Sequence, residues 1–323
     1  MQVYVIRRII QMIPLLIGVS MLSFFVLNLS PGDFLAEMQM NPDISDEIIA
    51  QLRAEFGLDQ PVWVQYFNWL GNLLQFNLGY SFAYRIPVGT LIGFRIMNTF
   101  RLSLASLLLA WVVAIPVGVH AAVNRYTARD NFLTFLTFLG ISIPNFFLGL
   151  ILLYFVATTD WLNLPTGGMT AWYHDELGFW AQVWDYIRHL ILPTIVLATA
   201  TMAGWMRQMR GQMMDALSAD YVRTARSKGL SERIVLYKHA LRNAINPLIT
   251  MAGFAISALL SGAAITEVVF SYPGLGNMLL NAVLQKDLYV AMAGLMMGSV
   301  LLILGNLIAD LMLAVVDPRI RYD

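Results

Sequence analysis

The stretch LSLASLLLAWVVAIPVGVHAA, residues 102–122, is 21 residues long and contains no Asp, Glu, Lys or Arg. Because an α-helix rises about 1.5 Å per residue, such a stretch crosses a hydrocarbon core about 30 Å thick. Five other stretches are long and apolar enough to do the same, approximately residues 9–29, 132–157, 186–206, 247–270 and 288–316. Together they predict an all-α integral membrane protein, a bundle of six transmembrane helices.

The composition agrees with a membrane protein. Of 323 residues, 58% are apolar and 12% are charged, and that charged share is about half of what soluble domains carry. Lys and Arg number 20, as do Asp and Glu, so the net charge gives no argument for nucleic acid binding. Cysteine is absent, which excludes disulfides, thiol catalysis and cysteine metal sites in this chain.

The basic residues predict the orientation. Residues 1–8, 123–131, 207–246 and 317–323 hold 14 of the 20 Lys and Arg residues, and six spans place these four segments on the same side. Basic loops face the cytoplasm, so both termini are predicted to be cytoplasmic. The span at 9–29 is predicted to be retained, because its apolar run exceeds the ~7–15 residues of a signal peptide.

The segment after the first span predicts a long external loop with structure of its own. In NPDISDEIIAQLRAEFGLD, residues 41–59, apolar positions recur at helical spacing, with Asn41 as a cap and Gly57 as a stop. A second helix is predicted from Pro61, and its aromatic side chains suit either the membrane surface or packing on the outer ends of the spans. We therefore divide the chain into residues 1–101, the first span and external loop, and residues 102–323, a five-helix transmembrane domain.

The most charged segment, residues 207–246, has eight basic and three acidic residues. Residues 219–228 are good helix formers, Gly229 stands where a left-handed cap is needed, and Ser231 can cap a second helix from Glu232. Two short capped helices are therefore predicted, at about residues 220–242.

Three interpretations of this helix pair compete. A DNA-reading helix-turn-helix needs a globular support that reaches the major groove, and a segment strung between two spans lacks one. A loop that only sets the orientation needs charge but not Gly229, Ser231 or apolar positions such as Ile234 and Leu241. The third interpretation, a helix pair that docks in the groove of a cytoplasmic partner, accounts for all of these features.

RTARSKG, residues 223–229, followed by HALRN, residues 239–243, resembles the cytoplasmic loop of permease subunits of ATP-binding-cassette importers. The consensus there is Glu-Ala-Ala, three residues, Gly, about nine residues and Ile-x-Leu-Pro. Its positions correspond here to Arg223, Thr224, Ala225, Gly229, His239, Leu241 and Arg242. Arg223 and Arg242 depart from the consensus as the dipeptide, oligopeptide and nickel branch of these permeases does.

Other segments are similar to the same branch along nearly the whole chain, among them residues 4–33, 56–74, LGYSF at 78–82, TEVVFSYPGLG at 266–276 and DPRIRYD at 317–323. The resemblance implies a permease subunit of an importer in the bacterial cytoplasmic membrane, with Ser231 and the seven matched residues coupling it to ATPases. It also implies as partners a second permease subunit, two ATPase subunits and an external solute-binding protein. No G-x-x-x-x-G-K-[ST] loop occurs, so no cofactor is expected in this chain, and ATP and Mg would be bound by the ATPases.

Two other classes of protein were weighed. The four histidines are scattered, the trio His174-Asp175-Glu176 is typical of solvated surface, and no G-x-S-x-G elbow occurs, so an enzyme is not favoured. An ion-coupled transporter or channel keeps ionisable groups within its spans. Candidates for a pathway or gate are Glu267, Asn306 and Asp310. Within the resembled family the cargo is peptide or, alternatively, nickel.

Overall fold

The computed structural model describes residues 2–29, 35, 45–55, 57–159, 161–249, 251–252, 255 and 263–316. Within these residues the regular elements are helices, and the only β-pairing is an isolated bridge between Tyr80 and Pro87. The all-α prediction is therefore confirmed for the part of the chain that is described.

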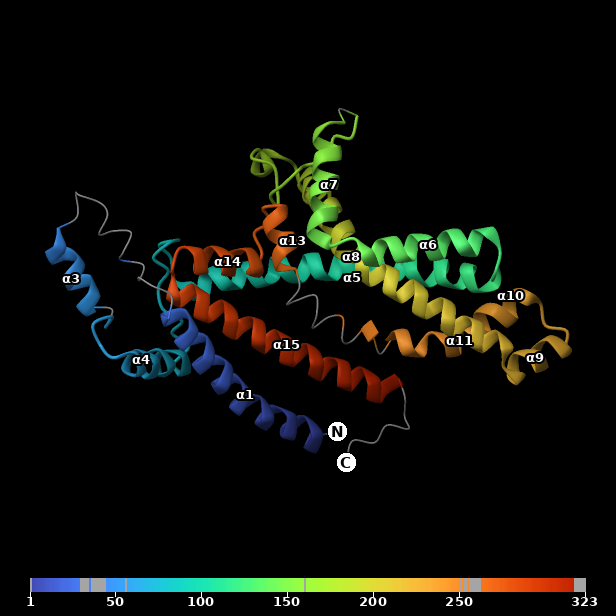
Figure 1. Ribbon diagram of the computed structural model, residues 1–323, viewed down its shortest axis with the longest axis horizontal. Helices are drawn as coiled ribbons and strands as arrows, with labels where there is room; N and C mark the ends of the chain where they lie inside the picture. The colour runs from blue at the N-terminus through green and yellow to red at the C-terminus, as the bar shows by residue number, and fades with distance from the viewer. Residues whose placement is uncertain are drawn as a thin grey trace. The chain divides into compact units, whose positions relative to one another are not determined.

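Figure 1 shows how the helices follow one another along the chain. They are α1 (Gln2–Asn28), α3 (Asp46–Glu55), α4 (Val62–Leu74), α5 (Val88–Val123), α6 (Ala128–Ser142), α7 (Asn145–Ala157), η1 (His174–Glu176), α8 (Phe179–Ser218), α9 (Asp220–Ser227), α10 (Glu232–Ile234), η2 (Val235–Ala240), α11 (Leu241–Ala244), α13 (Ala264–Val269), α14 (Leu275–Leu284) and α15 (Leu288–Val316).

Four of the described helices, α1, α5, α8 and α15, are long and apolar enough to cross a membrane, and α6 with α7 makes a fifth candidate. Large apolar side chains stay exposed along α1 and α6, for example Ile10, Leu22, Phe132 and Phe135. A helix that is apolar on its exposed face suits a hydrocarbon solvent. The predicted span at 247–270 lies partly outside the described residues, which leave out 250, 253–254 and 256–262.

The predicted span at 132–157 is broken into two helices. Two helices, α6 and α7, occupy this stretch and are bent by 103° at a break between Ser142 and Asn145. Pro144 explains the break, because it has no N–H to continue the helix and it drives Ile143 out of the helical region. Ile143 is extended, with φ −84° and ψ 120°.

The helices α5 and α8 are longer than their predicted spans, with 36 and 40 residues. At about 1.5 Å per residue they measure roughly 54 and 60 Å, well beyond the hydrocarbon core. The helix α8 ends only at Ser218, so Arg207 and Arg210 lie on it. The predicted segment 207–246 therefore begins within α8, because apolarity marks where lipid ends and not where the helix ends.

The chain forms two compact units, residues 1–99 with 273–303 and residues 100–272 with 304–323. In the first, α1, α4 and the start of α15 share a core of Phe24, Tyr66, Trp69 and Met292. The Ser20 hydroxyl lies 2.9 Å from the Tyr66 hydroxyl. The predicted division at residue 101 separates the first span and its loop from the other five spans. It is not a division into compact units, and it stays a prediction.

Both helices predicted for the segment after the first span are present, although α3 begins at Asp46, later than predicted. The helix α3 ends just before Gly57, which has the expected positive φ of 63°, and α4 begins directly after Pro61. The proposed cap at Asn41 lies outside the described residues. Further on, the Asp287 carboxylate accepts the Ser81 hydroxyl at 2.7 Å and the Ala83 N–H at 3.1 Å, which ties the 78–82 loop to the start of α15.

The second unit is built around α8. Its core combines small residues of α5, such as Ala110 and Ala114, with Met209 and Met213 of α8. The helices α6 and α7 both pack on α8, and α13 packs on α7 where Gly149 leaves room for Phe270. The carboxyl-terminal half of α8 thus connects the apolar part of this helix to the short helices that follow it.

Candidate functional site

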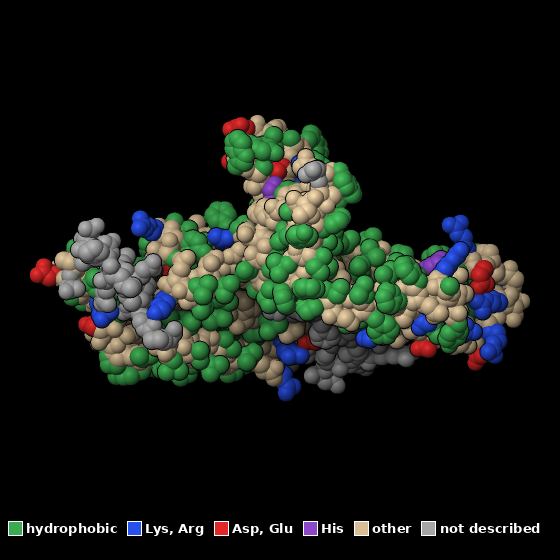
Figure 2. All heavy atoms as spheres, turned by 45° about the horizontal axis from the view of Figure 1, so that its top comes forward, with side chains coloured by type: hydrophobic (Ala, Val, Ile, Leu, Met, Phe, Trp, Pro, Cys, Tyr) green, Lys and Arg blue, Asp and Glu red, His purple; other side chains and the backbone are tan. Residues whose placement is uncertain are grey.

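The charged segment folds back on the end of α8. After α8 ends at Ser218, α9 runs away, a turn at residues 228–231 reverses the chain, and α10, η2 and α11 return along it (Figure 1). The two predicted capped helices are therefore present, and the second is continuous through α10, η2 and α11. Figure 2 shows charged side chains gathered at this end of the second unit.

One face of the helix pair is anchored in the core. Val222, Val235 and Ala240 are fully buried, and they share a cluster with Met209 and Met213 of α8. Each fully buried valine side chain contributes about 1.5 kcal/mol or more by leaving water. The pair is consequently a packed extension of α8 and not a loose loop.

The turn depends on its glycine. Gly229 has φ +73°, and a Cβ added there would meet no atom within 4 Å. The requirement for glycine is therefore conformational and not steric, because L-residues with a side chain are strained at positive φ. Ser231 takes the predicted N-cap position, with φ −62° and ψ 145°, but its hydroxyl makes no cap hydrogen bond. The helix start is exposed, so water can satisfy its free N–H groups instead.

An ion pair closes the turn. The Arg226 guanidinium donates to both carboxylate oxygens of Glu232, at 2.6 and 3.2 Å. The hydrogen bond with Arg226 lowers the pKa of Glu232, and the same contact raises the pKa of Arg226. Both side chains are about half exposed, so the pair fixes the geometry of the turn more than it stabilises the fold.

The outward face combines positive charge with apolar side chains. Six basic residues are exposed on the helix pair, Arg223, Arg226, Lys228, Arg233, Lys238 and Arg242. Tyr237 is 60% exposed, and Leu230 and Ile234 are also exposed. A rigid surface that combines positive charge with apolar side chains is suited to docking in an acidic groove of another protein. A loop that is only solvated has no need of such a surface.

The remaining residues predicted for this site divide between the two faces. Thr224 is exposed, and its hydroxyl donates to the Asp220 carbonyl at 2.9 Å. Ala225 is buried against the core, whereas His239 and Leu241 are half-buried. Only part of the predicted set can therefore touch a partner directly.

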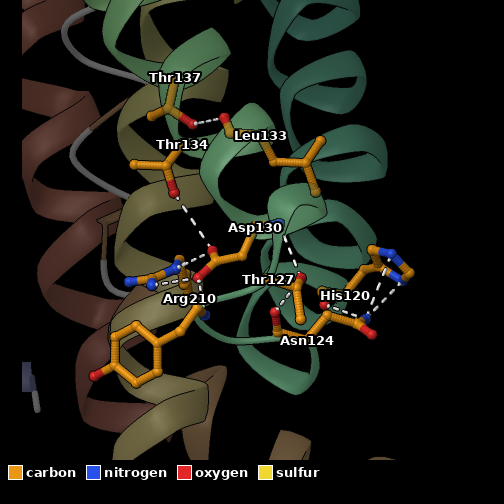
Figure 3. A network of polar contacts seen from close by, with 9 residues as sticks. His120, Asn124, Thr127, Asp130, Leu133, Thr134, Thr137 and Arg210 are labelled. Carbon is orange, nitrogen blue, oxygen red and sulfur yellow. Dashed lines mark hydrogen bonds and ion pairs between the residues drawn. The ribbon is translucent and has the colours of Figure 1, made fainter.

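A buried ion pair above the helix pair was missed by the sequence analysis. The Asp130 carboxylate, at the start of α6, accepts from Arg210 of α8 through two hydrogen bonds of 2.6 and 2.7 Å, as Figure 3 shows. Asp130 is 1% exposed and also accepts the Tyr126 N–H at 2.8 Å. The available signal was Thr127-x-x-Asp130 at a helix start, a variant of a capping box.

Comparison with known proteins identifies the family. Residues 114–322 match the family "Binding-protein-dependent transport system inner membrane component", and residues 1–103 match its partner family, "Binding-prot-dependent transport system membrane comp, N-term". The chain belongs to this permease family. It is thus a multi-pass inner membrane transport component, of a family of transport proteins and not of enzymes.

Relatives of this permease cover its whole length. It is 43% identical over 324 residues to the oligopeptide transport system permease protein AppB of Bacillus subtilis, with 100% of both chains covered. It is 37% identical over 335 residues to the dipeptide transport system permease protein DppB of Escherichia coli K12, covering 99% of this chain and 98% of the relative. The resemblance read from the charged segment is therefore confirmed.

The gate candidates of this permease lie on two helices. Glu267, on α13, is fully buried, whereas Asn306 is exposed and Asp310 half-buried on α15. Their role in a pathway stays a prediction.

A second feature of the permease that was not predicted is η2, a six-residue π-helix at Val235–Ala240. The exposed Tyr237 and Lys238 lie on it. Short π segments are rare and are frequent at functional sites. This one begins at the buried Val235, four positions after the N-cap.

Proposed function

We propose that this chain is a permease subunit of an ATP-driven peptide importer, forming half of the pathway together with a homologous second permease. Two relatives that match along their whole length are named as oligopeptide and dipeptide permeases, and this supports peptides as the cargo. Nickel, the alternative cargo of the resembled family, has no such support. Two ATPase subunits, which would bind ATP and Mg, and an external solute-binding protein complete the proposed complex.

The observation that carries the proposal is the rigid helix pair after α8. Its inner face is buried against Met209 and Met213, and its outer face offers basic and apolar side chains. A docked partner can push on such a pair without the force being lost in a flexible loop. Arg223, Thr224, Gly229, Ser231 and Arg242 are proposed to contact or shape the ATPase-facing surface.

The remaining residues of the predicted coupling set are proposed to support the outer face from the inner side of the helix pair. Ala225, His239 and Leu241 are buried or half-buried, so they position the outer face. Movement of the pair is passed to α8 through the shared core and to α6 through Asp130 and Arg210. Because ATP binding draws the ATPases together, the pair moves, and the pathway switches the side to which it opens.

The topology completes the proposal. Six spans, a long external first loop and cytoplasmic termini are proposed, because the helix pair must lie on the side where ATP is found. The apolar helices α1, α5, α8 and α15 with the bent α6 and α7 are consistent with this topology. Glu267, Asn306 and Asp310 remain the proposed pathway or gate residues.

A reconstitution experiment tests the proposed function. Proteoliposomes with this chain, the second permease, both ATPases and the binding protein are expected to take up radiolabelled di- and oligopeptides only when ATP is present. The chain alone, given a proton or sodium gradient, is expected to show background uptake. Gradient-driven uptake by the chain alone would instead establish an ion-coupled transporter or channel.

A further inference from the structure

The segment between α7 and α8, residues 158–178, is called the hairpin here. Together with the first turns of α8 it carries a cluster of exposed tryptophans. Trp161, Trp172, Trp180 and Trp184 are four of the eight tryptophans in the chain, and they are between 60 and 91% exposed. Each indole leaves a large apolar surface uncovered, which is costly in water. This exposure requires an explanation beyond a surface loop.

The hairpin is fastened to α8, so the tryptophans are held in place. The Asp185 carboxylate accepts the Ala171 N–H at 2.9 Å and contacts His174 Nδ1 at 2.7 Å. His189 Nδ1 lies 3.3 Å from the other oxygen of Asp185. The predicted solvated surface is thus correct for Asp175 and Glu176 but wrong for His174, which packs on this carboxylate.

Two further contacts secure the hairpin. The Gly168 N–H donates to the Phe270 carbonyl at 2.9 Å, next to α13. Arg188 of α8 donates to the Asn163 side-chain oxygen at 3.1 Å and to the Asn163 carbonyl. Both arms of the hairpin are therefore tied to the second unit.

The position of the cluster along α8 gives its depth in a bilayer. Arg188 and Arg207 bracket the apolar stretch of α8 and are 19 positions apart, which is about 28 Å of helix. Trp184 and Trp180 lie about 6 and 12 Å beyond Arg188 at the same rise. The headgroup layer is roughly 5–8 Å thick on each side, so Trp184 falls within it, whereas Trp180 lies beyond its outer edge.

The exposed surface is continuous with the lipid-facing side of the same helix. Val183 and Ile187 of α8 are exposed between the tryptophans and the exposed Ile195 in the middle of the span. Indole rings favour the headgroup layer, because the ring is apolar and its N–H finds a polar partner there. The acidic Asp175 and Glu176 of the hairpin are also exposed. If the tryptophans lie in the headgroup layer, these two carboxylates lie in the water beyond it.

We propose that Trp161, Trp172 and Trp184 anchor the hairpin in the lipid headgroup layer at the end of α8 opposite the charged helix pair. The anchor holds the outer end of α8 at a fixed depth while the helix pair moves its other end. The proposal rests on the membrane location of the chain and not on its cargo, so it can fail without affecting the peptide assignment.

Depth measurement by spin labelling tests the anchor. The chain has no cysteine, so Trp172→Cys and Trp184→Cys each give a single nitroxide site in the full-length chain, placed in nanodiscs of phosphatidylethanolamine and phosphatidylglycerol. The ratio of collisions with oxygen to collisions with a nickel chelate reports depth. We expect both labels to show a ratio severalfold above that of Asp175→Cys, three positions from Trp172, and below that of Ile195→Cys.

An unlabelled measurement guards against disturbance by the label. Native tryptophan fluorescence is expected to be quenched more by lipids brominated near the headgroup than by lipids brominated near the chain end. The difference should shrink when Trp161, Trp172 and Trp184 are replaced by phenylalanine, and the rest of the signal comes from the remaining tryptophans, among them the exposed Trp63. Labels at 172 and 184 that are as aqueous as the one at 175, or that become shielded only when the solute-binding protein is added, would overturn the anchor in favour of a protein-docking surface.

Discussion

Replacing Gly229 with valine is expected to reduce ATP-driven uptake by at least about tenfold while leaving membrane insertion intact. Gly229 has φ +73°, and a β-branched residue held there is strained by roughly 1–3 kcal/mol. The turn can escape the strain only by changing its backbone, which moves α9 relative to α10. A free-energy change of about 1.4 kcal/mol changes the population of the docking-competent turn tenfold. Strain of this size is therefore enough for the expected loss of uptake.

The measurement compares uptake with substrate-stimulated ATP hydrolysis in the reconstituted complex. Gly229→Asn is the conservative variant, because asparagine tolerates the left-handed conformation, and it should retain most of both activities. Gly211→Val is the matched control: it adds the same side chain on α8 into open space, without a positive φ. Wild-type uptake and wild-type stimulated hydrolysis in Gly229→Val would contradict the coupling role of the turn.

Replacing Arg210 with methionine is expected to destabilise the complex by about 3–5 kcal/mol, because it leaves the Asp130 charge buried without its partner. Asp130 is 1% exposed and lies 2.6 Å from Arg210. A loss near the lower end corresponds to a fall in the thermal midpoint of roughly 6–12 °C for a domain of this size. Thermal unfolding of the detergent-solubilised complex, followed by loss of monodisperse protein, measures it.

The control variant uses an exposed pair of the same kind. Arg223 lies 3.5 Å from Asp220, and both are largely exposed, so Arg223→Met should change stability by less than about 1 kcal/mol. The double variant Asp130→Asn with Arg210→Gln removes both charges and is expected to recover most of the lost stability. Equal midpoints for Arg210→Met and Arg223→Met would show that the buried pair does not hold α6 on α8.

Features of the structure that local physics decides were predictable from the sequence. The apolar stretches gave four helices that match in kind, because the free energy of burying apolar residues in lipid depends on composition alone. Gly229 and the N-cap position of Ser231 were predictable, because turns and helix starts use residue types that the backbone itself requires.

Features that contacts between distant residues decide were not predictable from the sequence. Asp130 and Arg210 are separated by 80 positions, and nothing local indicates that they meet. The contact of His174 with Asp185 likewise depends on how the hairpin folds over α8. The 103° bend between α6 and α7 was visible only as Pro144, and many proline-containing helices, such as α5 with Pro116, continue through the proline.

Photo-crosslinking from the helix pair tests the central claim most directly. The purified chain carries a cysteine-reactive benzophenone on Tyr237→Cys or, as a control at the opposite end of α8, on Asp175→Cys, and is then assembled with the other subunits. The account predicts that the label at 237 captures an ATPase subunit and that the label at 175 captures none. If the label at 237 captured no ATPase in a complex that still transports peptide, the helix pair could not be the element through which this permease is driven.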